Sequence, residues 1–181
     1  AMGVGLVWAA FAFAVHFTRK QGVAPLITGE EHCSTAVRSA AQEWKLGVLG
    51  CWYAILKIEM GFVFFGTASG LYRVLKEHVR ADEEKPRCQR TKVLIIDASG
   101  VYGIDATAVA IFAKVKRLSA KLKIDVVWAG LAANVHKRLA QRGVTAGSTT
   151  HATLDAAEKH VEDQLLQHVH NLSQRWLVDP T

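Results

Sequence analysis

The chain has 181 residues, half of them hydrophobic, and a formal net charge of +6 at pH 7, which fits one domain with an appendage and an ample core. Its three cysteines, Cys33, Cys51 and Cys88, are odd in number and have no C-x-x-C spacing, which argues against a disulfide framework or a zinc site. The positive charge would suit phosphate, anionic lipid or nucleic acid, although a solvated basic surface explains it equally well.

Residues 3–17 are apolar except for His16 and are followed by Arg19 and Lys20. This stretch is shorter than the ~20 residues that span a bilayer, and it lacks the basic start of a signal peptide. It is either the end of a transmembrane helix, with Arg19 and Lys20 on the cytoplasmic side, or an apolar helix that packs into a groove. We therefore treat residues 1–20 as a separate apolar segment.

Residues 21–47 are predicted to form a linker and a short helix. Glycines and a proline mark the linker over residues 21–32. Ser34 or Thr35 is placed to cap the helix. Its apolar face would contain Val37, Ala40, Ala41 and Trp44.

Residues 49–60 end in an alternating pattern that predicts a half-buried strand. After Gly61, residues 62–65 (FVFF) predict a second, buried strand that forms a hairpin with the first and buries Phe64 and Phe65. A helix is expected over residues 68–80. Residues 81–91 are charged and contain Pro86, which indicates an exposed loop.

Residues 93–113 (VLIIDASGVYGIDATAVAIFA) predict a buried strand, a glycine-containing loop and a helix. Asp105 is placed to cap this helix. A further strand is expected over residues 124–128 and a helix over residues 131–139 with Gly143 as its stop. Residues 144–150 are polar and predict no clear strand. Thr153 opens a long last helix with a continuous apolar face.

Three motifs resemble the STAS domain, the fold shared by anti-sigma-factor antagonists and the cytoplasmic tails of SulP-type anion transporters. Residues 104–108 (IDATA) are similar to the family's I-D-x-[ST]-[GA] turn, and residues 129–143 to its A-G-L segment. Residues 58–68 (IEMGFVFFGTA) resemble the opening of transporter STAS domains, which carry the double Phe that anti-sigma antagonists rarely have. The resemblance covers about residues 53–166.

The resemblance implies an α/β fold, with a mixed sheet of four or five strands and helices mainly on one face, over residues 48–181. It implies a regulatory domain on the cytoplasmic face of a transporter of anions such as sulfate, with no transport by this chain itself and no cofactor. Its partners would be the membrane domain of the parent, nucleotide, acyl carrier protein or anionic lipid, or a second copy in a homodimer. The alternative is a soluble anti-sigma-factor antagonist, a binding module.

The sequence contains no catalytic motif that we recognise and no metal-ligand spacing, so we expect neither an enzyme nor a metal site. The candidate site is an anion-attracting switch turn between a strand end and a helix start. Its residues are Asp97, Ser99, Asp105, Ala106 and Thr107. Alternatively, these polar groups only satisfy their own backbone.

Two predicted helices also carry a basic outer surface. It would contact anionic lipid or an acidic partner, or else is simply solvated. Nucleic acid is not expected, because no exposed aromatic residues alternate with these charges. The basic residues are Lys114, Arg117, Lys121, Lys137, Arg138 and Arg142.

Overall fold

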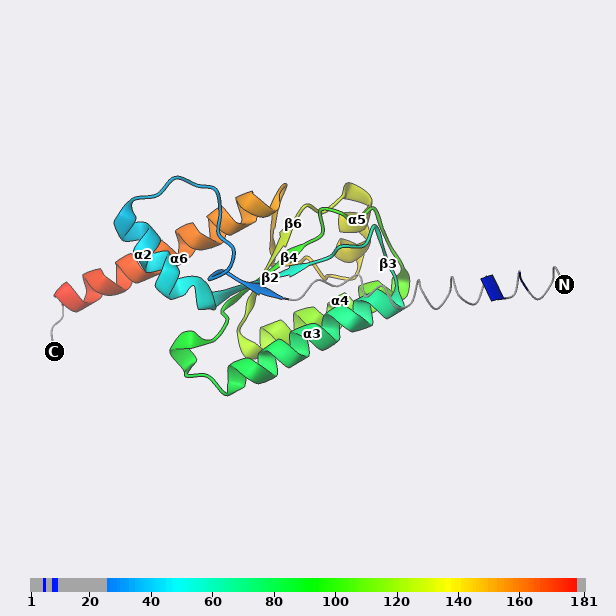
Figure 1. The fold of residues 1–181 in the computed structure, drawn as a ribbon, viewed down its shortest axis with the longest axis horizontal. Helices are drawn as coiled ribbons and strands as arrows, with labels where there is room; N and C mark the ends of the chain where they lie inside the picture. Colours follow the sequence, from blue (N-terminus) through cyan, green and yellow to red (C-terminus); the bar gives the residue numbers. More distant parts are fainter. Residues whose placement is uncertain (1–4, 6–7, 10–25, 179–181) are drawn as a thin grey trace.

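The central element of the structure is a five-stranded sheet in the order β1-β2-β4-β6-β7 (Figure 1). The structure is a computed structural model that describes Gly5, Trp8, Ala9 and residues 26–178. Strands β2, β4, β6 and β7 run parallel, and β1 pairs antiparallel with β2, so the sheet is mixed as predicted. The strands are β1 (Ile27–Thr28), β2 (Tyr53–Lys57), β4 (Val93–Asp97), β6 (Asp125–Ala129) and β7 (Thr149–His151).

Helices cover both faces of this sheet (Figure 1). Because side chains alternate along a strand, Ala54 and Leu56 of β2 face one apolar cluster, and Tyr53 and Ile55 face the other. The first cluster holds residues of α3 (Phe65–Glu83), α4 (Ala106–Leu122) and α5 (Ala133–Gln141). The second holds residues of α6 (Leu154–Val178), against which α2 (Ala40–Leu49) packs. Strand β2 is therefore buried on both faces, and not half-buried as the sequence pattern predicted.

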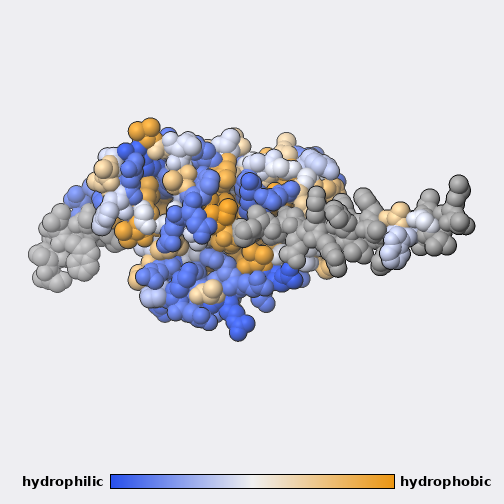
Figure 2. Space-filling view, viewed as in Figure 1, coloured by the Kyte–Doolittle hydropathy of each residue, from blue (hydrophilic) through white to orange (hydrophobic). Residues whose placement is uncertain are grey.

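Helix α3 is amphipathic, with Leu71 and Leu75 fully buried. Figure 2 shows hydrophilic residues over the region of α3, and a hydrophobic band between it and the elements above. The helix is longer than predicted and ends at Glu83, so residues 81–91 are not wholly an exposed loop. The carboxylate of Asp82 is buried and accepts hydrogen bonds from Thr91 N (2.9 Å) and Lys85 Nζ (2.9 Å). Burial alone would raise the pKa of Asp82, but these hydrogen bonds outweigh it and lower the pKa.

The predicted hairpin is wrong, because β3 (Phe62–Val63) pairs in parallel with β5 (Gly103–Ile104) in a separate two-stranded sheet. The Gly61 carbonyl accepts hydrogen bonds from Tyr102 N (2.7 Å) and Gly103 N (3.2 Å), which turns the chain away from β2. Within the run of four apolar residues, only Val63 is fully buried.

The burial predicted for the double Phe is also wrong. Phe65 begins α3 and has 59% of its surface exposed, and Phe64, which precedes the helix, is partly buried. The run resembles a buried strand in composition, but it serves as a short strand followed at once by a helix start.

The region predicted as a linker contributes to the fold. It supplies β1, and α2 begins after Ser39, whose side chain caps the helix by accepting from Gln42 N. Ser34 and Thr35 are not the caps, since their hydroxyls donate to Glu162 (2.6 Å) and Asp155 (2.8 Å) of α6. The apolar face predicted for this helix is not buried either, because Val37 and Trp44 are exposed.

The other predicted elements are present with small shifts in their ends. Helix α4 begins at the predicted cap, α5 ends before Gly143, whose φ is +66°, and α6 begins after Thr153. The polar stretch before α6 does form a short strand, β7. No helix within the described residues is long and apolar enough to cross a membrane. Except for Gly5, Trp8 and Ala9, the apolar stretch of residues 3–17 lies outside the described residues.

Candidate functional site: the switch turn and the groove between α4 and α5

The first half of the predicted switch turn follows β4. Asp97 is the last residue of that strand and its side chain is buried. One of its carboxylate oxygens accepts hydrogen bonds from both the backbone N (3.0 Å) and the hydroxyl (2.5 Å) of the exposed Ser99. This carboxylate therefore shapes its own turn, which is the structural alternative to an anion-binding role.

The second half of the turn begins α4. The Asp105 carboxylate accepts a hydrogen bond from Ala108 N at 2.6 Å and so caps the helix, as predicted. Ala106 and Thr107 are exposed in the first helical turn. Since the N-terminus of a helix carries a partial positive charge, negative charge is favoured at this surface.

Two of the predicted basic residues lie at this turn. The guanidinium of Arg138 on α5 donates a hydrogen bond to the Ile104 carbonyl (2.6 Å), which ties α5 to β5. Arg138 and Arg142 line a cavity of about 330 Å³ together with Ala106, Val109 and Gln141. The structure thus brings Ala106 of the switch turn next to two cations that are more than thirty residues away in sequence.

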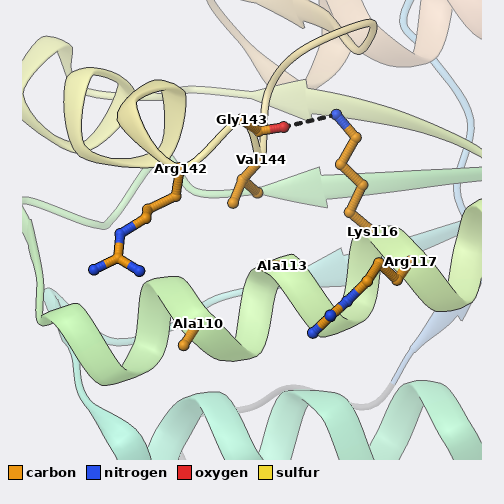
Figure 3. Close-up of a pocket in the computed structure, with 7 residues that line it drawn as sticks. All are labelled: Ala110, Ala113, Lys116, Arg117, Arg142, Gly143 and Val144. Carbon is orange, nitrogen blue, oxygen red and sulfur yellow. Dashed lines mark hydrogen bonds between the residues drawn. The ribbon is translucent and has the colours of Figure 1, made fainter.

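A second cavity, of about 410 Å³, continues from Arg142 along α4 (Figure 3). It is lined by Ala110, Ala113, Lys116, Arg117, Arg142, Gly143 and Val144. The Lys116 ammonium donates hydrogen bonds to the carbonyls of Gly143 (2.9 Å) and Ala146, and so holds the loop after α5 against α4. We call these two adjoining cavities the α4–α5 groove.

The groove has a positive lining, since its residues include Lys116, Arg117, Arg138 and Arg142 and no carboxylate. The other three predicted basic residues, Lys114, Lys121 and Lys137, are exposed and do not line it. The predicted basic surface is therefore divided between the groove and the solvated helix faces.

Sequence reasoning missed Lys116 and the groove itself. The available signal was a helical face of small residues, Ala106, Ala110 and Ala113, that continues into Arg117 at spacings of four, three and four. Alanine side chains on this face of α4 are too small to fill the space beside the helix, so a cavity remains there. Arg117, one turn further along the same face, gives the cavity a positive lining. The residues that line the other side of the cavities, on α5 and in the loop after it, are brought there by tertiary packing, which the local sequence does not reveal.

Within the described part of the chain, no group of three or more His, Cys, Asp or Glu side chains is arranged to hold a metal ion.

Comparison with solved structures gives several matches to transporter proteins. The murine Solute Carrier 26 family member A9 (Slc26a9) anion transporter in the inward-facing state matches with a TM-score of 0.53 and 14% identity, over 81% of this chain and 22% of that chain. A sulfate transporter family protein from Wolinella succinogenes matches with a TM-score of 0.49 and 19% identity, over 64% of this chain and 88% of that chain. At these identities the likeness concerns the fold alone.

A SulP transporter STAS domain from Vibrio cholerae also matches, with a TM-score of 0.46 and 14% identity, over 54% of this chain and 77% of that chain. No curated protein matches the sequence. The model of the STAS domain family matches residues 53–157, more than half of the chain, which include the sheet core, the switch turn and the groove. This chain belongs to the STAS domain family.

Proposed function

We propose that this chain is the regulatory domain of a SulP-type anion transporter, placed on the cytoplasmic face of the membrane, and that the parent carries an anion such as sulfate. The observation that carries the proposal is the fold likeness to the Slc26a9 anion transporter, which extends over 81% of this chain but only 22% of that one. The chain itself would neither transport nor catalyse. The apolar residues 3–17, followed by Arg19 and Lys20, support a link to a membrane domain.

The α4–α5 groove is the proposed regulatory contact. Its four cations and the N-terminus of α4 would attract an acidic group, either a carboxylate of the parent's membrane domain or a phosphate of nucleotide, acyl carrier protein or anionic lipid. Position 106 is an alanine and has no hydroxyl. In anti-sigma antagonists this position carries the serine that is phosphorylated, so the alternative role as such an antagonist lacks its switch. A docked acidic group would take the place of a covalent phosphate.

The test is anion uptake by the parent transporter in cells that lack their own uptake system. Arg142→Glu reverses a charge shared by both cavities, and Lys137→Glu makes the same change on the exposed side of α5. A hydrogen bond to a charged group contributes about 1.5–3 kcal/mol, so the Arg142 variant should change uptake by about tenfold or more. The Lys137 variant should behave as wild type at equal surface amounts.

Two results would refute the proposal. A parent protein without anion uptake would exclude the transporter role. Wild-type uptake in the Arg142→Glu variant, with its folding confirmed by thermal unfolding, would exclude the groove as the regulatory contact.

A further inference from the structure

Three exposed aromatic residues lie on the β3–β5 sheet or directly next to its strands in sequence, and they do not line the groove. Phe62 and Tyr102 keep 44% and 69% of their surface exposed, and their ring centroids lie 6.3 Å apart. Phe65, at the start of α3, is 59% exposed. We call these three residues the aromatic face. None of the cavities described above is lined by them.

The two rings of the pair occupy the space that side chains at two glycines would fill. A Cβ atom at Gly103 would lie 2.6 Å from Cδ2 of Phe62, and one at Gly61 would lie 2.2 Å from Cε1 of Tyr102, so any side chain at either glycine would displace a ring. The backbone of Tyr102 is fixed as well, since its carbonyl accepts a hydrogen bond from the Asn134 side chain (2.7 Å). Each exposed ring of the pair therefore packs directly on a glycine.

The chain enters the domain at the same end. Ile27 pairs with Ile55 and Thr28 with Ala54 in antiparallel register, so β1 starts next to the carboxyl end of β2, which is Lys57. The segment that leads to β3 leaves from this end, and Figure 1 shows β3 and α2 at opposite ends of the domain. Residues 18–25, which connect the apolar stretch to Leu26, can extend over at most about 30 Å. An apolar stretch seated in a membrane would hold this end of the domain near the bilayer.

The charge at this end suits an anionic surface. Lys57 at the end of β2 is exposed, and Arg138 and Arg142 lie beside Ala106. Among residues 57–66 and 99–106, Glu59 is the only exposed acidic residue. Exposed aromatic rings next to cations are typical of surfaces that enter the headgroup region of anionic bilayers.

We propose that the aromatic face, Phe62, Phe65 and Tyr102, contacts an anionic lipid bilayer and orients the domain with the carboxyl ends of its parallel strands toward the membrane. The inference rests on the proposed function in one respect, the placement of residues 3–17 in a membrane. It goes beyond that function by assigning the orientation of the domain and the residues that touch lipid. Exposed rings that line none of the described cavities fit the headgroup layer better than they fit a peptide.

The test uses the full chain bound to vesicles of phosphatidylglycerol and phosphatidylcholine, with hydrogen exchange of backbone amides as a local readout. A local readout is needed because residues 3–17 can bind lipid by themselves. Amides of residues 60–66 and 100–105 should exchange about tenfold more slowly on anionic vesicles than in solution. Vesicles of phosphatidylcholine alone should protect them less, since the cations then have no headgroup charge to meet.

Variants separate the aromatic face from general lipid binding. Phe62→Ser combined with Phe65→Ser and Tyr102→Ser should remove the protection, and Phe65→Ser alone should weaken it, because each buried ring contributes about tenfold to partition. The matched control is Trp44→Ser, which removes an aromatic residue that is 72% exposed on α2 at the other end of the domain. This control should leave the protection unchanged. Thermal unfolding checks that each variant is folded.

Several outcomes would overturn the inference. They are a vesicle-bound chain with no protection at these amides, equal protection in the folded Phe65→Ser variant, and protection that rises with protein concentration without vesicles. The last result would assign the face to contact between copies. If the parent fails to take up anions while the vesicle result holds, the proposed function falls and the lipid contact stands.

Discussion

Ala106 occupies the first helical position of α4, next to the cap Asp105 and to the cavity lined by Arg138 and Arg142. It is exposed, so a longer side chain fits there without repacking the core. The helix N-terminus and the two guanidinium groups all favour negative charge at this point. The position is therefore a sensitive place to measure whether this end of the groove favours negative charge.

We predict that Ala106→Glu raises the free energy of unfolding and that Ala120→Glu lowers it. Ala120 is exposed in the last turn of the same helix, where the dipole disfavours negative charge. Both changes replace Ala by Glu within one helix, so the difference in helix propensity largely cancels between them. Each charge effect is about 0.3–1 kcal/mol, and urea unfolding should separate the two variants by about 1 kcal/mol. Equal stabilities, or the reverse order, would show that position 106 does not attract negative charge.

Side chains that act on their own backbone could be predicted from the sequence. The cap at Asp105 is predictable because this aspartate directly precedes a run of apolar residues at helical spacing. Its hydrogen-bond partner, Ala108 N, is only three positions away. The roles of Asp82 and Glu162 could not be found in this way. Both carboxylates are buried, and Glu162 binds Ser34, which is 128 residues away in sequence. Without the fold, an acidic residue in a polar stretch is expected to be exposed.

At the scale of elements, the segment before α2 is bound to α6 as a strap. We define the strap as residues 32–38. Within it, Ser34 donates to Glu162 from its backbone N (2.8 Å) and its hydroxyl (2.6 Å), and Arg38 forms an ion pair with the same carboxylate at 2.9 Å. The hydroxyl of Tyr53 on β2 lies within hydrogen-bond distance of the His32 carbonyl of the strap (3.0 Å) and of Glu162 (3.3 Å), and it shares its one proton between these two acceptors. One buried carboxylate thus joins the strap, the sheet and α6.

A second buried carboxylate lies one helical turn earlier on α6. Glu158 contacts Nδ1 of His32 at 2.5 Å, and burial raises the pKa of Glu158 in spite of this hydrogen bond. Thr35 of the strap binds Asp155 through its backbone N (2.7 Å) and its hydroxyl (2.8 Å). Release of the strap would leave buried carboxylates without partners, so this segment belongs to the cooperative domain.

We predict that Arg38→Ala destabilises the domain by about 3–5 kcal/mol, because it leaves the Glu162 carboxylate buried without its cation. The side chains of the pair are only 8% and 2% exposed, so solvent screens the interaction little. Urea unfolding measures the change. Lys159→Ala, which removes an exposed cation from the same helix, should change stability by less than about 0.5 kcal/mol.

A second variant tests the cause. Replacing Glu162 by Gln removes the buried charge, so the Arg38→Ala, Glu162→Gln double variant should lose less stability than the two single variants together. An Arg38→Ala protein as stable as wild type would mean that the Arg38–Glu162 ion pair contributes no stability.

Long helices and strands could be predicted from the spacing of their apolar residues, and very short strands could not. Helices α4 and α6 were found because an apolar face repeats over several turns, which a strand cannot imitate. Strands β1 and β3 have only two residues each, too few to show a period. Their partners, Ile55 and Gly103, lie 28 and 41 positions away from Ile27 and Phe62, and no local rule selects them.

At the scale of the whole molecule, the fold is held by two apolar clusters on opposite faces of one sheet. Among the described residues, Leu26 is the first that packs against either cluster. The mixed architecture could be predicted because buried strands alternate with amphipathic helices along residues 93–139. The use of residues 26–49 could not, since β1 completes the sheet edge by pairing with residues 26 and 28 positions away, and the contacts that cover α6 span more than one hundred positions.

The last prediction concerns the boundary of the domain. Removal of residues 3–17 should leave one cooperative unfolding transition within a few degrees of that of the full chain, because Leu26 and the residues after it supply the buried side chains of both apolar clusters. The shortened chain should also be more soluble, since it loses a continuous apolar stretch. Thermal unfolding followed by circular dichroism measures the first effect, and size-exclusion chromatography measures the second.

Removal of residues 3–38 is the contrasting case. It deletes β1 and the strap, uncovers the edge of β2 and leaves Glu158 and Glu162 without their strap partners. That chain should lose cooperative unfolding. A non-cooperative transition after removal of residues 3–17 alone would place the apolar stretch inside the folded core.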